Sequence, residues 1–96
     1  MTTAQAAKIL KALSHPNRLD IYLSIARGDA CDFEDGCGCC VSDIMARLRI
    51  GAPTVSHHLK ELVNAGLILT ERQGKHLVAR ANPAVIEEVT RLLRTV

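Results

Sequence analysis

The sequence predicts a mainly α-helical domain that carries one small β-hairpin. Apolar residues recur at the three- and four-residue steps of helices through most of the chain. That spacing is lost between residues 67 and 81, where two extended runs flank Gln73 and Gly74. The chain has 96 residues, which is the size of one domain, so residues 1–96 are expected to fold as a single unit.

The first two helices are expected on either side of a break at Ser14, His15 and Pro16. Helical spacing over residues 4–13 places Ala6, Ile9, Leu10 and Leu13 on one face. Pro16 suits the first turn of the next helix, with Ser14 or His15 as its cap. That helix is expected to end at Gly28 and to bury one face, made of Leu19, Tyr22, Leu23 and Ala26.

The second half of the chain predicts a helix-turn-helix followed by a hairpin. Residues 41–64 contain two short helices with a turn that contains Gly51, and Pro53 opens the second of them. The inward residues of that second helix are expected to be Val55, Leu59, Leu62 and Val63. Strands are expected over 67–72 and 75–81, and Asn82 and Pro83 then cap and open a final apolar helix. The order α-α-α-α-β-β-α is that of a winged helix-turn-helix, with residues 67–81 as the wing.

Charge is divided unevenly along the chain. The net charge of +2 combines four acids within seven residues of the loop (Asp29, Asp32, Glu34 and Asp35) with a basic second half. Between Arg47 and Arg80 there are six Lys and Arg against two Glu, a balance of +4, which favours a phosphate-bearing partner.

The second helix of the pair is the candidate DNA-reading element. Its outward hydroxyls and imidazole, on Thr54, Ser56 and His57, can bond base edges, and Lys60 can neutralise a phosphate. His58 lies beside Leu59 and Leu62 and is expected to be half-buried. At the tip of the hairpin are two cations and an amide, on Arg72, Lys75 and Gln73. A wing uses such groups to contact the DNA backbone or the minor groove.

The chain contains "LKALSHPNRLDIYLSIARG" and, further on, "VSHHLKELVNAGL" followed by the wing sequence "RQGK". With these motifs, residues 7–84 resemble the ArsR/SmtB family of metal-responsive repressors, with one interruption at the cysteine loop. The resemblance implies a homodimer built by the first and last helices. It also implies binding to a palindromic operator, with half-sites about 34 Å apart, and release when an inducer binds.

The cysteines form the candidate sensing site. All four lie in the cysteine-rich loop 29–40: Cys31, Cys37, Cys39 and Cys40. Members of the family that respond to arsenite or to soft divalent ions often carry Cys-Val-Cys-Asp-Leu, where this chain has Cys40, Val41, Ser42, Asp43 and Ile44. Cys37, Cys39 and Cys40, with Cys31 as a possible fourth, are therefore expected to bind a thiophilic ion. Arsenic(III) or antimony(III) is favoured, and cadmium, lead or zinc also fits.

Other uses of the same residues remain open. Two of the cysteines can instead form a disulfide or react with a persulfide, which would make a redox switch. A small metal-buffering protein would bind no operator, and the basic wing speaks against it. No nucleophile with an orienting base is evident, so an enzyme is not expected. No run approaches the roughly 18 apolar residues of a membrane span, and a cytoplasmic location, which keeps thiols reduced, is expected.

Overall fold

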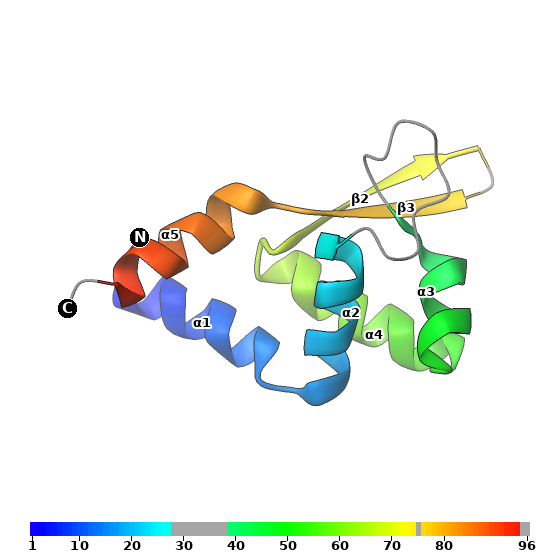
Figure 1. Cartoon of the computed structure of the whole chain (residues 1–96), viewed down its shortest axis with the longest axis horizontal. Helices are drawn as coiled ribbons and strands as arrows, with labels where there is room; N and C mark the ends of the chain where they lie inside the picture. The colour runs from blue at the N-terminus through cyan, green and yellow to red at the C-terminus, as the bar shows by residue number, and fades with distance from the viewer. Residues whose placement is uncertain (28–38, 75, 95–96) are drawn as a thin grey trace.

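The computed structural model describes residues 1–27, 39–74 and 76–94. Its helices are α1 (Thr3–Leu13), α2 (Pro16–Arg27), α3 (Val41–Leu48), α4 (Ala52–Asn64) and α5 (Pro83–Leu93). Its strands are β1 (Cys39–Cys40), β2 (Ile68–Gln73) and β3 (His76–Ala81). The predicted mainly α-helical fold with a β-hairpin is confirmed, and β1 is an addition to it. In Figure 1 the hairpin extends away from the end of the molecule that holds α1 and α5.

The corner between α1 and α2 is held by local hydrogen bonds. Thr2 and Gln5 form a reciprocal capping box at the start of α1. At the start of α2 the backbone N–H of Asn17 donates to His15 Nδ1 over 3.1 Å. Of the two predicted caps, His15 is therefore the one that caps α2.

The apolar face predicted for α2 is confirmed at Tyr22, which is buried, and at Leu23, which is partly buried, but it is wrong at Leu19 and Ala26. The structure buries Ile21, Tyr22, Ser24 and Ile25, whereas Leu19 is 39% exposed and Ala26 is also exposed. Apolar residues cover more than half of the circumference of this helix, from Ile21 round to Leu23, so its own periodicity does not select which of them face the core. Packing selects it, because α2 lies against α1, α3, α4 and β3 at once.

The buried core is aliphatic apart from Tyr22. The most deeply buried residues are contributed by α2, α3, α4 and the start of the hairpin: Ile21, Ile44, Val55, Leu62, Leu67 and Ile68. Two residues expected inside, Leu10 and Val63, are exposed. In their place α1 buries Ala12 and α4 buries His58.

The turn between α3 and α4 contains Gly51, as predicted, but its residue with left-handed backbone is an arginine. Arg49 has a φ of 55°, in the left-handed region, whereas Gly51 has an ordinary φ of −65° at the N-cap of α4. Gly51 provides no side-chain cap, and Pro53 occupies the first turn. Backbone strain in the helix-turn-helix is therefore concentrated at Arg49.

The sheet has the order β1-β3-β2 and is antiparallel throughout. The hairpin pairs Ile68 with Ala81 and Gln73 with His76, and Gly74 takes a φ of 62° in the turn. Strand β2 begins one residue later than predicted, and the predicted first residue of the second strand, Lys75, lies outside the described residues. Leu67 belongs to the preceding turn, where its N–H donates to Leu62 O over 3.0 Å and Gly66 has a φ of 80°.

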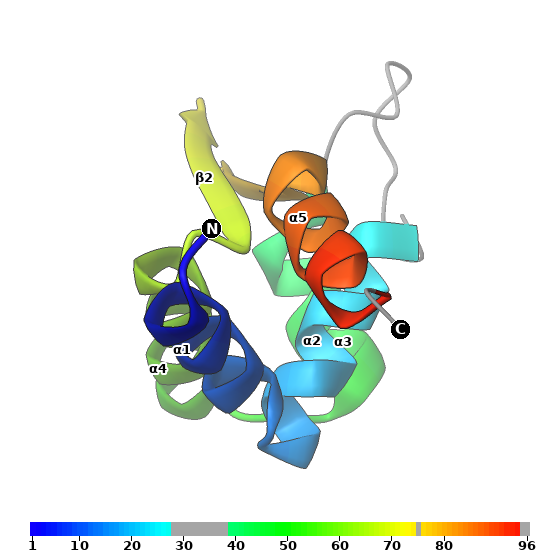
Figure 2. The same ribbon diagram turned by 90° about the vertical axis from the view of Figure 1, so that its left-hand side faces the viewer.

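Helix α5 is tied to the end of α4 at one point. The Asn82 side chain donates to Gly66 O over 3.1 Å instead of capping α5, although Asn82 occupies the N-cap position. Figure 2 shows α1 and α5 at the same end of the molecule, with both chain termini. No helix in the described part of the chain is long and apolar enough to cross a membrane.

Candidate nucleic-acid interface and cysteine segment

Helix α4 separates an apolar face from a polar one. Val55, Leu59 and Leu62 are buried in the core. All four residues predicted to contact DNA from this helix are exposed: Thr54, Ser56, His57 and Lys60. With 13 residues, α4 is about 20 Å long at 1.5 Å per residue, enough to lie across a DNA groove.

The predicted wing residues do not share one face. Side chains alternate along a strand, so Thr70 and Arg72 lie on the side of Ile68, and Gln73 lies on the other side with Glu71. Arg72 is exposed and Gln73 is half-buried. Lys75 lies outside the described residues. On the Gln73 side, Arg80 forms an ion pair with Glu71 over 3.1 Å between the two strands.

His58 faces inward from α4. Only 6% of it is exposed, its ring centroid lies 4.6 Å from that of His15, and its Nδ1 has no hydrogen-bond partner. Burial lowers the pKa of His58 below its ordinary value of 6.5, and the nearby His15, Arg18 and His57 lower it further, opposed by Glu61. His58 is therefore a neutral core residue, more deeply buried than expected.

Two hollows flank α4, and residue spacing predicted neither of them. The first has a volume of about 250 Å³ and lies between α4 and the hairpin; it is lined by Ser56, Leu59, Lys60, Val63, Thr70 and Leu77. The second, about 230 Å³, lies between α4, α1 and α2; it is lined by Lys8, Lys11, Ala12, Arg18, Glu61, Asn64 and Ala65. The first hollow lies between a helix and the hairpin that follows it, and the second joins elements far apart in the chain. Both depend on how these elements pack together, which residue spacing alone does not reveal.

The cysteine segment enters the described structure at β1. The backbone of Cys39 pairs with Ala79, and that of Cys40 pairs with Val78, both on β3. Helix α3 begins at the next residue, Val41. Cys31 and Cys37 lie outside the described residues, as does most of the loop 29–40. The described side chains contain no group of three His, Cys, Asp or Glu that could hold a metal ion.

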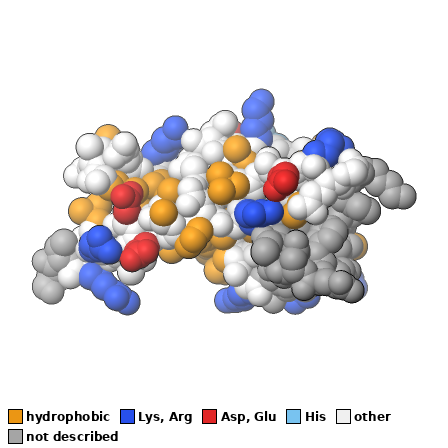
Figure 3. Space-filling view, turned by 90° about the horizontal axis from the view of Figure 1, so that it is seen from above, with side chains coloured by type: hydrophobic (Ala, Val, Ile, Leu, Met, Phe, Trp, Pro, Cys, Tyr) orange, Lys and Arg blue, Asp and Glu red, His pale blue; other side chains and the backbone are white. Residues whose placement is uncertain are grey.

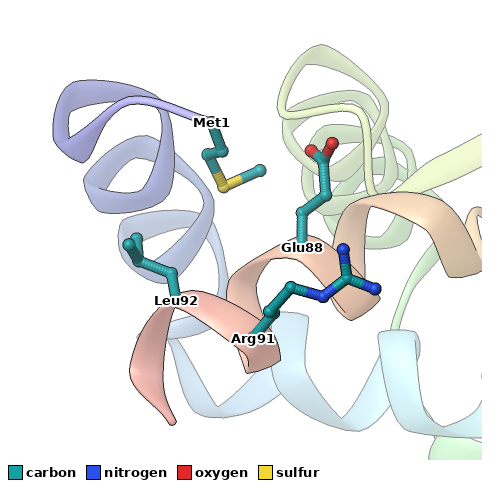
Figure 4. A pocket seen from close by; sticks show the side chains of 4 residues that line it. All are labelled: Met1, Glu88, Arg91 and Leu92. Atoms are coloured by element: carbon teal, nitrogen blue, oxygen red, sulfur yellow. The ribbon is translucent and has the colours of Figure 1, made fainter. Parts of the chain in front are cut away.

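The end of the molecule formed by α1 and α5 is rich in exposed apolar side chains. Leu93 is 60% exposed, and Val89 is the single buried residue of α5. Met1, Glu88, Arg91 and Leu92 surround a hollow of about 280 Å³ beside α5 (Figure 4). Viewed from above, hydrophobic side chains gather over α5 and the neighbouring hairpin, with charged groups around them (Figure 3).

Comparison with known proteins supports one family. The family model described as "Bacterial regulatory protein, arsR family" matches residues 33–70. The chain is 27% identical over its whole length to the arsenical resistance operon repressor of Staphylococcus aureus, covering 84% of that protein. It is 37% identical to an uncharacterized HTH-type transcriptional regulator of Methanocaldococcus jannaschii, covering 73% of this chain and 70% of that one.

The fold agrees with a solved structure from Mycobacterium bovis, a homodimeric winged helix-turn-helix DNA-binding domain described as a possible ArsR-family regulator. The two share a TM-score of 0.73 at 24% identity, over 94% of this chain and 76% of that one. The arrangement of α3, α4 and the hairpin, the matched family model and the related repressors lead to one conclusion. The chain belongs to the ArsR family of winged helix-turn-helix, DNA-binding transcriptional repressors.

Proposed function

We propose that residues 1–96 form one DNA-binding unit that represses transcription as a homodimer on a palindromic operator. A thiophilic metal or metalloid, with arsenic(III) or antimony(III) favoured, binds the cysteines of the loop 29–40 and releases the DNA. The related Staphylococcus aureus repressor is named for arsenical resistance, which supports this class of inducer. Cadmium, lead and zinc remain competing inducers because they also bind thiolates.

On the operator, α4 enters the major groove. Thr54, Ser56 and His57 read base edges, and Lys60 contacts a phosphate. The exposure of all four side chains supports these roles. Arg72, Gln73 and Lys75 hold the backbone or the minor groove beside the hairpin. Arg72 and Gln73 lie on opposite faces of β2, so they contact different parts of the duplex.

The homodimer forms through α1 and α5. The exposed Leu10 and Leu93, and a helix α5 that buries only Val89 in its own chain, support this interface. Burying such apolar side chains against a second copy contributes roughly 25 cal/mol for each Å² removed from water. A two-fold dimer then presents two copies of α4 to half-sites about 34 Å apart.

The pairing of β1 with β3 carries the proposed release mechanism. Cys39 and Cys40 are joined by backbone pairing to the wing strand, and Cys40 directly precedes α3. Drawing Cys37, Cys39 and Cys40 onto one ion, with or without Cys31, therefore acts on α3 and on the wing together. The ion supplies the bonds that gather the thiolates. A coupling free energy of about 1–3 kcal/mol would weaken operator binding roughly 5- to 150-fold.

The test begins with duplexes selected from a random pool by the reduced protein, with binding followed by fluorescence anisotropy. Arsenite, antimonite, Cd²⁺, Pb²⁺, Zn²⁺ and hydrogen peroxide are then titrated into the complex. We expect arsenite or antimonite to release the DNA at the lowest concentration. Substituting Cys37, Cys39 and Cys40 together by Ser should preserve DNA affinity and abolish release.

Three results would contradict the proposal. Failure to enrich any duplex would reject operator binding. Release by peroxide alone would assign the cysteines to redox sensing. Arsenite release that persists in the triple Ser variant would reject the cysteine site, and the single Cys31→Ser variant then reports whether a fourth thiolate matters.

A further inference from the structure

We propose that the two hollows beside α4 seat the two sugar–phosphate strands that border the major groove of the operator. This inference rests on the proposed entry of α4 into that groove. An α-helix with its side chains is about 10–12 Å wide, and the major groove of B-DNA is about 12 Å wide. The helix therefore fills the groove, and one DNA strand must pass along each of its two flanks.

The residues of α4 divide between the two flanks as this arrangement requires. Ser56 and Lys60, four positions apart, lie on the edge that faces the hairpin. Glu61 and Asn64, three positions apart, lie on the edge that faces α1 and α2. The exposed His57, four positions before Glu61, lies along the Glu61–Asn64 edge, at the border of the surface that would meet the bases.

The hollow on the hairpin side has the chemistry of a deoxyribose–phosphate seat. Hydroxyls of Ser56 and Thr70 and the ammonium of Lys60 line it beside apolar groups of Val63 and Leu77. A sugar offers an apolar surface, and its phosphates accept hydrogen bonds from hydroxyl and ammonium donors. Arg72 follows Thr70 on the same strand face, about 7 Å further along, and continues the line of donors toward the wing tip.

The hollow on the other side is basic. Lys8, Lys11 and Arg18 carry three positive charges against the single negative charge of Glu61, which leaves a balance of +2. The Arg18 Nε–H is buried and has no hydrogen-bond partner, and the guanidinium adds its positive charge to the lining of this hollow. A phosphate supplies the acceptors and the negative charge that this set of side chains lacks.

This use of α1 is compatible with its proposed place in the dimer. Leu10 is two residues from Lys8, which places the two side chains about 160° apart around the helix. The buried residues Ala6, Ile9 and Ala12 occupy a third direction. Helix α1 can therefore present Leu10 to a second copy and its lysines to DNA.

The test compares variants on one duplex selected by the wild-type protein, with affinity measured from 50 to 200 mM salt. A dimer of the Lys8→Gln/Lys11→Gln variant lacks four lysines, so the slope of log K against log salt should become shallower by about 3–4. Thr70→Val removes a hydroxyl and no charge, and should weaken binding roughly tenfold with an unchanged slope.

Two further variants make the result decisive. Glu61→Gln removes the acid from the basic hollow, so it should raise the affinity severalfold, which a damaged fold cannot do. Arg27→Gln removes a cation about 14 Å along α2 from Arg18 and should change neither quantity. An unchanged slope in the double lysine variant, or unchanged or weaker binding by Glu61→Gln, would overturn the basic seat. If Thr70→Val binds the duplex with the affinity of the wild type, the proposed seat on the hairpin side would be overturned. The proposed function fails separately, if the wild-type protein selects no duplex.

Discussion

The imidazole rings of His15 and His58 lie 4.6 Å apart between centroids and are tilted by 46°. His15 caps α2 by accepting the Asn17 N–H at Nδ1, and an Nδ1 that carries a proton cannot accept that bond. His58 is buried on α4 with no partner for its own Nδ1. The contact between α4 and the α1–α2 corner therefore joins the ring that caps α2 to the buried ring of His58.

The first prediction is that stability falls in mild acid. The pKa of His58 is lowered in the folded protein. Below about pH 6.5, His58 therefore binds a proton in the unfolded chain while it stays neutral in the folded chain. The free energy of unfolding is therefore unaffected by His58 protonation above that pH, and it decreases as the pH falls below it. Urea midpoints at pH 7.5, 6.5 and 5.5, at one protein concentration, measure the effect.

His58→Leu should flatten this pH dependence, because it removes the buried titrating group and keeps an apolar side chain against His15. His57→Gln is the matched control, since His57 is exposed on the same helix. It should retain the dependence. A His58→Leu variant that loses as much stability in acid as the wild type would contradict the assignment.

The second prediction concerns the face that α2 buries. Ile21 is fully buried and Leu19 is 39% exposed. We expect Ile21→Ala to lower the free energy of unfolding by about 2–5 kcal/mol, whereas Leu19→Ala should cost less than about 1 kcal/mol. Chemical denaturation of both variants and the wild type, at one protomer concentration, measures the two losses in the free energy of unfolding. Equal losses, or a larger loss at Leu19, would favour the face expected from the sequence.

The third prediction concerns the strained turn before α4. Arg49 has a φ of 55°, a conformation that glycine adopts without the Cβ penalty of about 1–2 kcal/mol. Allowing for the greater entropy of glycine in the unfolded chain, Arg49→Gly should stabilise the protein by about 0.5–1 kcal/mol. Ala46→Gly, three residues earlier within α3, should instead destabilise it by about 1 kcal/mol. Thermal midpoints that fall in both variants would argue against left-handed backbone at Arg49.

The fourth prediction tests the surface proposed for dimerisation. Leu93 on α5 and Leu69 on β2 are 60% and 51% exposed. Leu93→Glu places a charge where a second copy should pack and is expected to weaken the dimer at least tenfold, because burying an unpaired charge is costly. Leu69→Glu should leave the dimer intact. Sedimentation equilibrium distinguishes the two, and an undiminished dimer in Leu93→Glu would exclude Leu93 from the interface.

The sequence by itself determined the order of the helices and the hairpin. Breaks at Pro16, Gly66 and Gly74, and the change in apolar spacing near residue 67, are local signals that need no knowledge of distant residues. The family followed from the same local pattern. The outward placement of Ser56 and Lys60 on α4 also followed, because helical spacing fixes which side chains oppose the core.

Only the tertiary structure decided which surfaces meet. Apolar residues cover more than half of the circumference of helix α2, and its contacts with four other elements made Ile21, and not Leu19, a core residue. The pairing of Cys39 with β3 joins residues forty positions apart, and the hollow beside Lys8 joins three helices. Such contacts arise from packing between segments that are distant in the chain, and local residue spacing does not predict which segments pack together.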